Sequence, residues 1–166
     1  GERGGRAGYL FNSGIAAIEE ADAILIIGSN PRLEAPVLNA RIRKRHLKGG
    51  CAIGVIGEKA DLTYPYTYMG AGPETLGKLE SHALAKAQKP MFIIGQGALA
   101  RPDGAAVLAS AYRAATAIGV IKDGWNGFNV LHLAAARMGG LMLGFAQDGG
   151  IADLVAAKPK LLLALG

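Results

Sequence analysis

Ala21 to Arg45 reads ADAILIIGSNPRLEAPVLNARIRKR. Its segment Ala23 to Ile27 is a short, unbroken apolar run, the pattern of a strand buried on both faces of a parallel sheet. Gly28-Ser29-Asn30-Pro31 follows as a sharp turn, and a helical pattern begins at Glu34 with a proline tolerated in its first turn. A strand, a tight turn and a helix in this order form the usual ligand crevice of an open α/β sheet, where backbone N–H groups favour an anion.

The same arrangement occurs a second time. Met91 to Ile94 predicts another buried strand, and Gly95-Gln96-Gly97 follows at its carboxyl end, before a helix over Asp103 to Ile118. In a parallel sheet the two loops could flank one crevice, whose candidate binding residues are Gly28, Ser29, Asn30, Gly95 and Gly97.

Two interpretations of this crevice stay open. The functional one is a cradle for a phosphate or pyrophosphate, as in a dinucleotide or a pterin dinucleotide. The structural one is a pair of tight turns that need glycine for backbone geometry alone. Neither loop contains G-x-G-x-x-G, and the sequence has no Walker loop, so the residues by themselves favour the structural interpretation.

Strand-like and helical patterns alternate along the chain. This alternation predicts an α/β fold with three layers, a mostly parallel sheet carrying helices on both faces. Further strands are expected at Ala52–Ile56, Val120–Ile121 and Lys160–Leu165, with an edge strand or packed loop within Glu58–Gly72 and a loop over Lys122–Asn129. Helices are expected over Ile15–Glu20, Glu34–Leu47, Pro73–Gln88, Val130–Met138 and Gly149 to Ala157. Asn12 or Ser13 is expected to cap the first, and Gly139-Gly140 to end the fourth. In Pro73–Gln88 the expected buried residues are Leu76, Leu79 and Ala83.

Composition bounds the class of protein. The chain has 166 residues, of which 51% are hydrophobic and 19% charged, as expected for one globular α/β domain over residues 1–166. A glycine-rich start without an initiator methionine, and a strand-like run at the end, give the expectation that this domain is part of a larger one. The net charge of +5 is modest and aromatic residues are few, so nucleic-acid binding is not expected. No apolar run approaches the ~20 residues that span a bilayer, so direct membrane insertion is not expected either.

No catalytic or metal-binding constellation is recognisable. Cys51 is the single cysteine and is predicted to be a buried, inert thiol; an iron–sulfur cluster needs about four thiolates. His46, His82 and His132 have no metal-ligand spacing, and the last two are expected on helices. No serine lies in a G-x-S-x-G elbow.

For several polar segments, a purely structural role is expected before a functional one. Arg41 to Lys48 is expected to be a solvated basic helix face, or else to meet an acidic neighbour. Thr63 to Tyr68 is expected to close over the core, or else to form a platform for a partner. The carboxylates of Glu19, Glu20 and Asp22 are expected at the solvated surface, and Asp123 and Asp148 in turns.

Several separate strings carry a family resemblance. ADAILIIGSNPRLEAPVLNARIRKR is similar to the strand, G-[ST]-N-P turn and arginine-rich helix of the molybdopterin oxidoreductase family. With YLFNSGIAAIEEAD, KPMFIIGQGALARPDGAAVL and DGWNGFNVLH, the chain resembles the large iron–sulfur subunits of proton-pumping NADH:quinone oxidoreductases, which form the peripheral arm of respiratory complex I. The resemblance covers nearly the whole chain and matches only the region with the molybdopterin-enzyme fold.

This resemblance implies a non-catalytic scaffold that supports electron transfer from NADH to quinone. It implies other peripheral-arm subunits as partners, at the cytoplasmic face of a bacterial inner membrane or the matrix side of a mitochondrial one. It also implies iron–sulfur clusters in another part of the parent subunit, and no cofactor on this chain, since Cys51 fits no cluster pattern. Whether the chain itself is enzymatic stays open.

Two further hypotheses remain beside the scaffold. In the first, the chain is the cofactor-binding domain of a true molybdopterin oxidoreductase, and Asn30 and Gly97 contact a pterin phosphate or guanine. In the second, it is a generic dinucleotide-binding domain, such as the middle domain of a thiamine enzyme, which uses a similar K-P strand and G-x-G-A loop. The YLFNSGIAAIEEAD string argues against the second.

Overall fold

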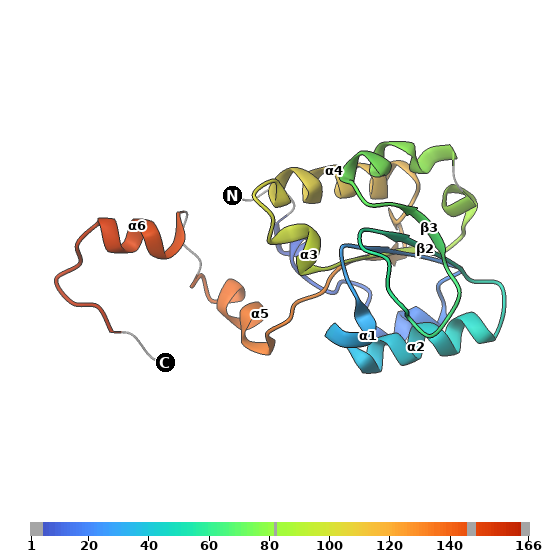
Figure 1. Ribbon diagram of the computed structural model, residues 1–166, viewed down its shortest axis with the longest axis horizontal. Coiled ribbons are helices and arrows are strands. Elements are labelled where there is room, and N and C mark those ends of the chain that lie inside the picture. Colours follow the sequence, from blue (N-terminus) through green and yellow to red (C-terminus); the bar gives the residue numbers. More distant parts are fainter. Residues whose placement is uncertain (1–4, 82, 146–148, 164–166) are drawn as a thin grey trace.

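A computed structural model of the chain shows a parallel sheet between two layers of helices (Figure 1). The structure describes residues 5–81, 83–145 and 149–163, without the side chains at 80, 81 and 83. The predicted α/β class and its three layers are therefore confirmed. In spatial order the strands are β3 (Thr67–Gly70), β2 (Ala52–Ile56), β1 (Ala23–Ile27), β4 (Pro90–Ile94) and β7 (Phe128–Val130).

Strand β1 is the centre of the sheet. It pairs in parallel with β2 on one edge and β4 on the other, in register from Ala23 to Ile27. All five of its side chains are buried, as the apolar run predicts. The chain passes from β1 to β2 and β3 on one side and then returns to β4 on the other. This reversal places the topological switch point between β1 and β4.

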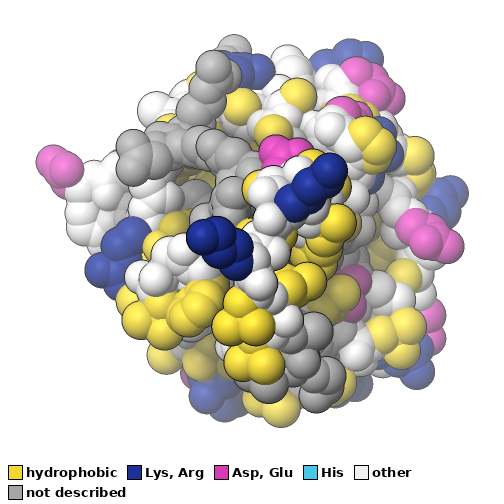
Figure 2. All heavy atoms as spheres, turned by 90° about the vertical axis from the view of Figure 1, so that its left-hand side faces the viewer, with side chains coloured by type: hydrophobic (Ala, Val, Ile, Leu, Met, Phe, Trp, Pro, Cys, Tyr) yellow, Lys and Arg dark blue, Asp and Glu magenta, His cyan; other side chains and the backbone are white. Residues whose placement is uncertain are grey.

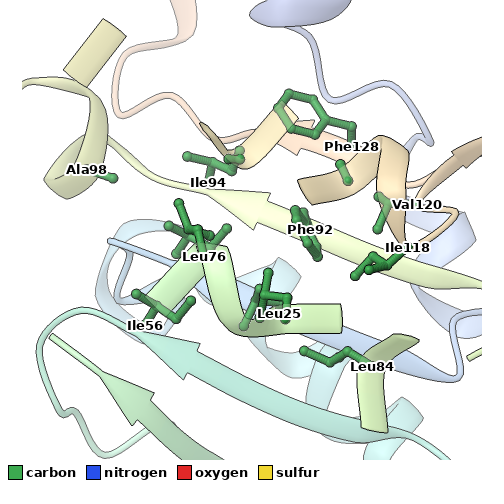
Figure 3. Close-up of a cluster of buried hydrophobic side chains, with 14 of the residues drawn as sticks. Leu25, Ile56, Leu76, Leu84, Phe92, Ile94, Ala98, Ile118, Val120 and Phe128 are labelled. Carbon is green, nitrogen blue, oxygen red and sulfur yellow. The ribbon is translucent and has the colours of Figure 1, made fainter. Parts of the chain in front are cut away.

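The alternation of side chains along the strands divides the core into two clusters. Leu25 and Ile27 point into the cluster shown in Figure 3, where Phe92 and Ile94 of β4 meet the helices of one layer. That layer contains η3 (Pro73–Ser81), η4 (Ala83–Lys86) and α4 (Gly104–Ala117). Ile24 and Ile26 face the second cluster, beneath η2 (Ile15–Glu19) and α2 (Pro36–Leu47).

The predicted helix over Glu34–Leu47 is interrupted. A short α1 (Pro31–Glu34) ends at Ala35, and α2 then begins at Pro36. Ala35 has φ −151° and ψ 72°, outside the helical region. The cause is local, because the ring of a proline disfavours the α conformation in the residue before it.

Two other helix predictions need correction. The single helix expected over Pro73–Gln88 is a pair of 3₁₀ helices, η3 and η4. Leu76 and Leu79 of η3 are buried as predicted, and their spacing of three residues is the repeat of a 3₁₀ helix. The side chain of Ala83 lies outside the described part. Helix η2 is capped by Gly14 without a side-chain bond. Asn12 and Ser13 instead bond to β7, at the Phe128 carbonyl and the Asn129 side chain.

The region around β7 differs most from prediction. The expected loop over Lys122–Asn129 contains a hairpin of β5 (Ile121–Lys122) and β6 (Trp125–Asn126), with Asp123 in its turn as predicted. Trp125 is buried and donates its indole N–H to the Pro90 carbonyl at 2.7 Å. The helix expected over Val130–Met138 begins five residues later, at Ala135 in α5 (Ala135–Met142), because Val130 ends β7. His132 is therefore in a loop, where its Nε2 lies 2.7 Å from the Tyr9 carbonyl oxygen.

The last part of the described chain projects from the sheet as an arm (residues 133–145 and 149–163), drawn in orange and red in Figure 1. Helix α5 (Ala135–Met142) runs through the predicted stop at Gly139-Gly140, and α6 (Gly150–Ala156) follows as expected. Neither helix buries a residue, and Phe145 and Leu161 are 84% and 85% exposed. Figure 2 views this side, where hydrophobic side chains gather beside Lys and Arg. Residues 160–163 form no strand; 164–166 and Asp148 lie outside the described residues.

The basic helix face is paired within the chain. Glu19, expected at the solvated surface, accepts a hydrogen bond from Arg41 at 3.1 Å and lies within 4 Å of the ammonium groups of Lys44 and Lys48. Arg45 donates to the Ala21 carbonyl at 2.7 Å. The acidic neighbour of this face is thus η2, which the basic residues fix onto α2. Nearby, Glu20 pairs with Lys89, and the Asp22 carboxylate accepts the main-chain N–H groups of Gln88 and Lys89.

The tyrosine segment closes over the core, as expected. Tyr64 is buried and donates to Asn39 Oδ1 at 2.7 Å, while the Asn39 amide donates to the Leu62 carbonyl. The Tyr66 hydroxyl bonds to both the N–H and the carbonyl of Ala60. These bonds fix the loop that leads to the edge strand β3. Among the described residues, no helix is both long enough and apolar enough to cross a membrane.

Replacing Tyr64 with phenylalanine should lower the free energy of unfolding by about 1–2 kcal/mol. The change leaves the buried Asn39 Oδ1 without its donor. Tyr68→Phe is the control, since this hydroxyl lies at the surface and its loss should cost about 0.5 kcal/mol or less. Urea unfolding of both variants at pH 7 measures the difference. Equal losses would show that the buried bond contributes nothing extra.

The pH dependence gives a second readout of the same residue. Burial raises the pKa of Tyr64 above its ordinary value. The folded state therefore holds this proton more tightly than the unfolded chain, so its contribution is complete below about pH 10 and is lost as pH rises further. The loss of stability above pH 10 should be smaller in Tyr64→Phe than in the unsubstituted protein.

Hydrogen exchange should separate the arm from the sheet. The amides of α6 should be fully exchanged before those of β1 begin to exchange, because α6 buries no side chain and β1 is buried on both faces. Mass spectrometry of peptides from 150–156 and 23–27 after short deuterium pulses measures both. Comparable protection of the two segments would contradict the arrangement.

Candidate functional site

The structure brings the two predicted loops side by side. Ile27 and Ile94 are register partners at the ends of β1 and β4, so Gly28 and Gly95 start their loops at the same edge of the sheet. The Gly95 N–H donates to the Ile27 carbonyl at 2.9 Å. The site therefore lies at the switch point, where open α/β sheets bind ligands.

The glycines are packed against each other. A Cβ atom built on Gly95 would lie 2.6 Å from the Gly28 carbonyl oxygen, and one on Gly97 would lie 2.7 Å from the same atom. Gly28 has φ +57°, and a Cβ there would lie 2.5 Å from the main-chain nitrogen of Ala98. Contact between the two backbones thus requires glycine at all three positions, which is the structural interpretation of the loops.

A cleft of about 480 Å³ opens beside this contact. Gly28, Ser29, Asn30 and Gly97 line it, whereas Gly95 is buried beneath the loops and does not. Its apolar lining residues include Ile27, Ile56 and Val107, and its charged lining residues are Glu34, Glu58, Lys59 and Arg101.

The second predicted loop is mostly helical: Gly95 precedes a short helix α3 (Gln96–Leu99), and Gln96, its first residue, binds the scaffold. Its amide donates to the Leu131 carbonyl at 2.9 Å, and its Oε1 accepts a bond from Arg137 of α5 at 2.7 Å. The side chain is buried and both polar ends have partners. This loop therefore holds the segment after β7 and the base of the arm.

Glu34 bonds to the first loop. One carboxylate oxygen accepts the Ser29 hydroxyl at 2.7 Å, and the other accepts the Asn30 main-chain N–H at 2.8 Å. Glu34 was not among the predicted site residues. Its position four residues after Asn30 could have indicated it, since a carboxylate near a helix start commonly reaches back to a free N–H group. Asn30 Oδ1 is buried here without a hydrogen-bond partner.

Cations near the cleft also have partners within the chain. Arg101 forms two bonds to Asp103, at 2.7 and 2.8 Å, and a hydrogen bond from this guanidinium lowers the pKa of the carboxyl. Lys59 lies over the ring of Tyr68, 4.6 Å from its centroid. Arg32 pairs with Asp61.

The candidate metal ligands are dispersed. Cys51 is buried, and burial raises the pKa of its thiol, as the inert-thiol prediction requires. It directly precedes β2, at the amino-terminal ends of the parallel strands, whereas the cleft lies at their carboxyl ends. His46 lies on α2 with Nδ1 3.3 Å from the Cys51 carbonyl oxygen, and His82 lies outside the described residues. Within the described ranges, no three His, Cys, Asp or Glu side chains group as a metal site.

A pyrophosphate group fits this site poorly. The Ser29 hydroxyl and the Asn30 N–H, the donors that would receive it, are held by a carboxylate of the same chain. The space between the glycine loops is filled by backbone. The remaining cleft is large enough for a small molecule but does not present a free anion seat at the first loop.

The fold and the cleft place the chain in the class of open α/β proteins that carry a crevice at the switch point of a parallel sheet. A family model described as molybdopterin oxidoreductase matches residues 2–166, and the chain belongs to this family. This confirms the resemblance drawn from the G-S-N-P turn.

Three individual proteins are similar in sequence to most of this chain. The chain is 40% identical over 167 residues to the mitochondrial NADH-ubiquinone oxidoreductase 78 kDa subunit of Neurospora crassa, covering 97% of this chain and 22% of that protein. It is 38% identical over 149 residues to the mitochondrial NADH dehydrogenase (ubiquinone) iron-sulfur protein 1 of Solanum tuberosum, covering 86% and 20%. It is 39% identical over 151 residues to an NADH-quinone oxidoreductase subunit from Rickettsia bellii, covering 87% and 22%. The chain thus spans about a fifth of the length of these curated relatives.

Gly28→Ala should destabilise the fold by about 2 kcal/mol or more. The new methyl group would overlap the Ala98 backbone and would also place alanine at a positive φ. Gly77→Ala is the matched control, because a Cβ there meets no atom within 4 Å. Thermal unfolding of both variants tests the packing; a Gly28→Ala protein as stable as the control would contradict it.

Proposed function

We propose that this chain is a non-catalytic structural part of the large iron–sulfur subunit of a proton-pumping NADH:quinone oxidoreductase. The names of the relatives support the assignment to that subunit. The observation that carries the non-catalytic role is the closed first loop, where Glu34 holds the donors that a cofactor phosphate would need.

In this role the chain supports electron transfer from NADH to quinone by packing rather than by chemistry. Its partners are other subunits of the peripheral arm, on the cytoplasmic face of a bacterial inner membrane or the matrix side of a mitochondrial one. Iron–sulfur clusters belong to another region of the parent subunit, since the single Cys51 cannot supply a set of thiolates. The exposed apolar arm is consistent with a chain that has further packing partners.

A second function has one specific observation in its favour. The cleft of about 480 Å³ lies within the size range of small-molecule sites, and the buried Asn30 Oδ1 lacks a donor. Under this alternative the chain is the pterin-dinucleotide-binding domain of a molybdopterin oxidoreductase. Gly28, Ser29, Asn30 and Gly97 would then line the site, with Asn30 and Gly97 in contact with the cofactor.

Cofactor content distinguishes the two functions. The purified chain should release no pterin dinucleotide on denaturation and contain no stoichiometric iron or molybdenum. Mass spectrometry of the released nucleotides and elemental analysis measure these quantities, with a cofactor-loaded family member denatured in parallel to establish recovery. About one pterin dinucleotide per chain would establish the alternative, and stoichiometric iron would contradict the scaffold role.

A further inference from the structure

The carboxylate of Glu34 occupies the place of a bound anion. Its two oxygens accept bonds from the Ser29 hydroxyl and the Asn30 N–H, at 2.7 and 2.8 Å. A phosphate oxygen at this turn would need the same two donors. It would also lie against a like charge, and the two would repel strongly in a partly buried site.

The rest of the lining would suit an anion if this carboxylate were absent. Lys59 and Arg101 line the same cleft, and Glu58 is the other acidic lining residue. The charged lining residues are therefore two positive and two negative, and Arg101 is also bound to Asp103, which is not in the lining. Loss of the Glu34 charge would leave Glu58 as the acidic lining residue, opposite two cations and two released donors.

We propose that Glu34 is a resident anion that determines the specificity of the cleft by excluding phosphate-bearing ligands. The inference rests on the proposed function, because it names the residue that keeps an inherited crevice closed to its former ligand class. Glu34 does more than stabilise a turn in this proposal: its removal creates an anion site.

Inorganic pyrophosphate is the probe, titrated calorimetrically at low ionic strength into the whole chain. Glu34→Ala should bind it at least about tenfold more tightly than the unsubstituted protein, because two donors are released and one repulsive charge is lost. Glu58→Ala is the matched control: it removes the same charge from the same cleft without releasing Ser29 or Asn30. It should show no comparable gain.

The outcomes distinguish exclusion of phosphate by Glu34 itself from a general effect of the net charge of the cleft. Equal gains in Glu34→Ala and Glu58→Ala would overturn the proposal in favour of net charge. A folded Glu34→Ala protein with no gain would also overturn it. If that variant does not fold alone, folding in the presence of pyrophosphate supports the resident-anion role. Failure of both Glu34→Ala and Glu34→Gln to fold at any pyrophosphate concentration would leave Glu34 a purely structural residue and overturn the proposal.

The two proposals fail in different experiments. Stoichiometric iron in the unsubstituted chain would refute the scaffold function alone. Bound pterin dinucleotide in the unsubstituted protein would refute both proposals, because that cofactor bears phosphate groups. Absence of a gain in Glu34→Ala would refute this inference and leave the function standing.

Discussion

Strand β1 is bound on both edges and buried on both faces, and the remaining elements are arranged by that double burial. Its edges take β2 and β4, and its faces divide the core into the cluster beneath α4 and the cluster beneath α2. Pairing on both edges places β1 in the middle of the sheet. The chain extends the sheet on one side through β2 and β3 and then returns to β4 on the other, and this reversal creates the switch point.

The cleft at that switch point follows from backbone packing. Because β1 and β4 are adjacent and in register, their two loops begin only one strand spacing apart. Side chains at Gly28, Gly95 or Gly97 would collide with the opposite loop. The loops are thus close enough to fill each other's space, and the open volume lies beside them, toward β2 and Lys59.

The sequence predicted the elements whose signals are local and strong. The apolar run of β1 and its glycine turn had no competing pattern, and β2 and β4 followed from the same pattern. The break at Ala35 was predictable from Pro36, but the longer helical periodicity prevailed in the interpretation. Strand β7 was missed because three residues centred on Asn129 carry almost no periodicity; its identity comes from pairing with β4. Gly139-Gly140 does not end α5, although each glycine costs an exposed helix about 1 kcal/mol relative to alanine, and nothing in the packing of α5 explains why the helix continues.

The candidate site shows why glycine alone is weak evidence for a cofactor. The sequence correctly placed Gly28, Ser29, Asn30, Gly95 and Gly97 at one edge of the sheet, because parallel strands bring their carboxyl ends together. Contact between the two loops would require the same glycines whether or not a ligand binds. The discriminating residue is Glu34, whose carboxylate accepts bonds from the Ser29 hydroxyl and the Asn30 main-chain N–H. We therefore expect Glu34, one helical turn after Asn30, rather than the glycines, to decide whether the crevice of this chain accepts a phosphate.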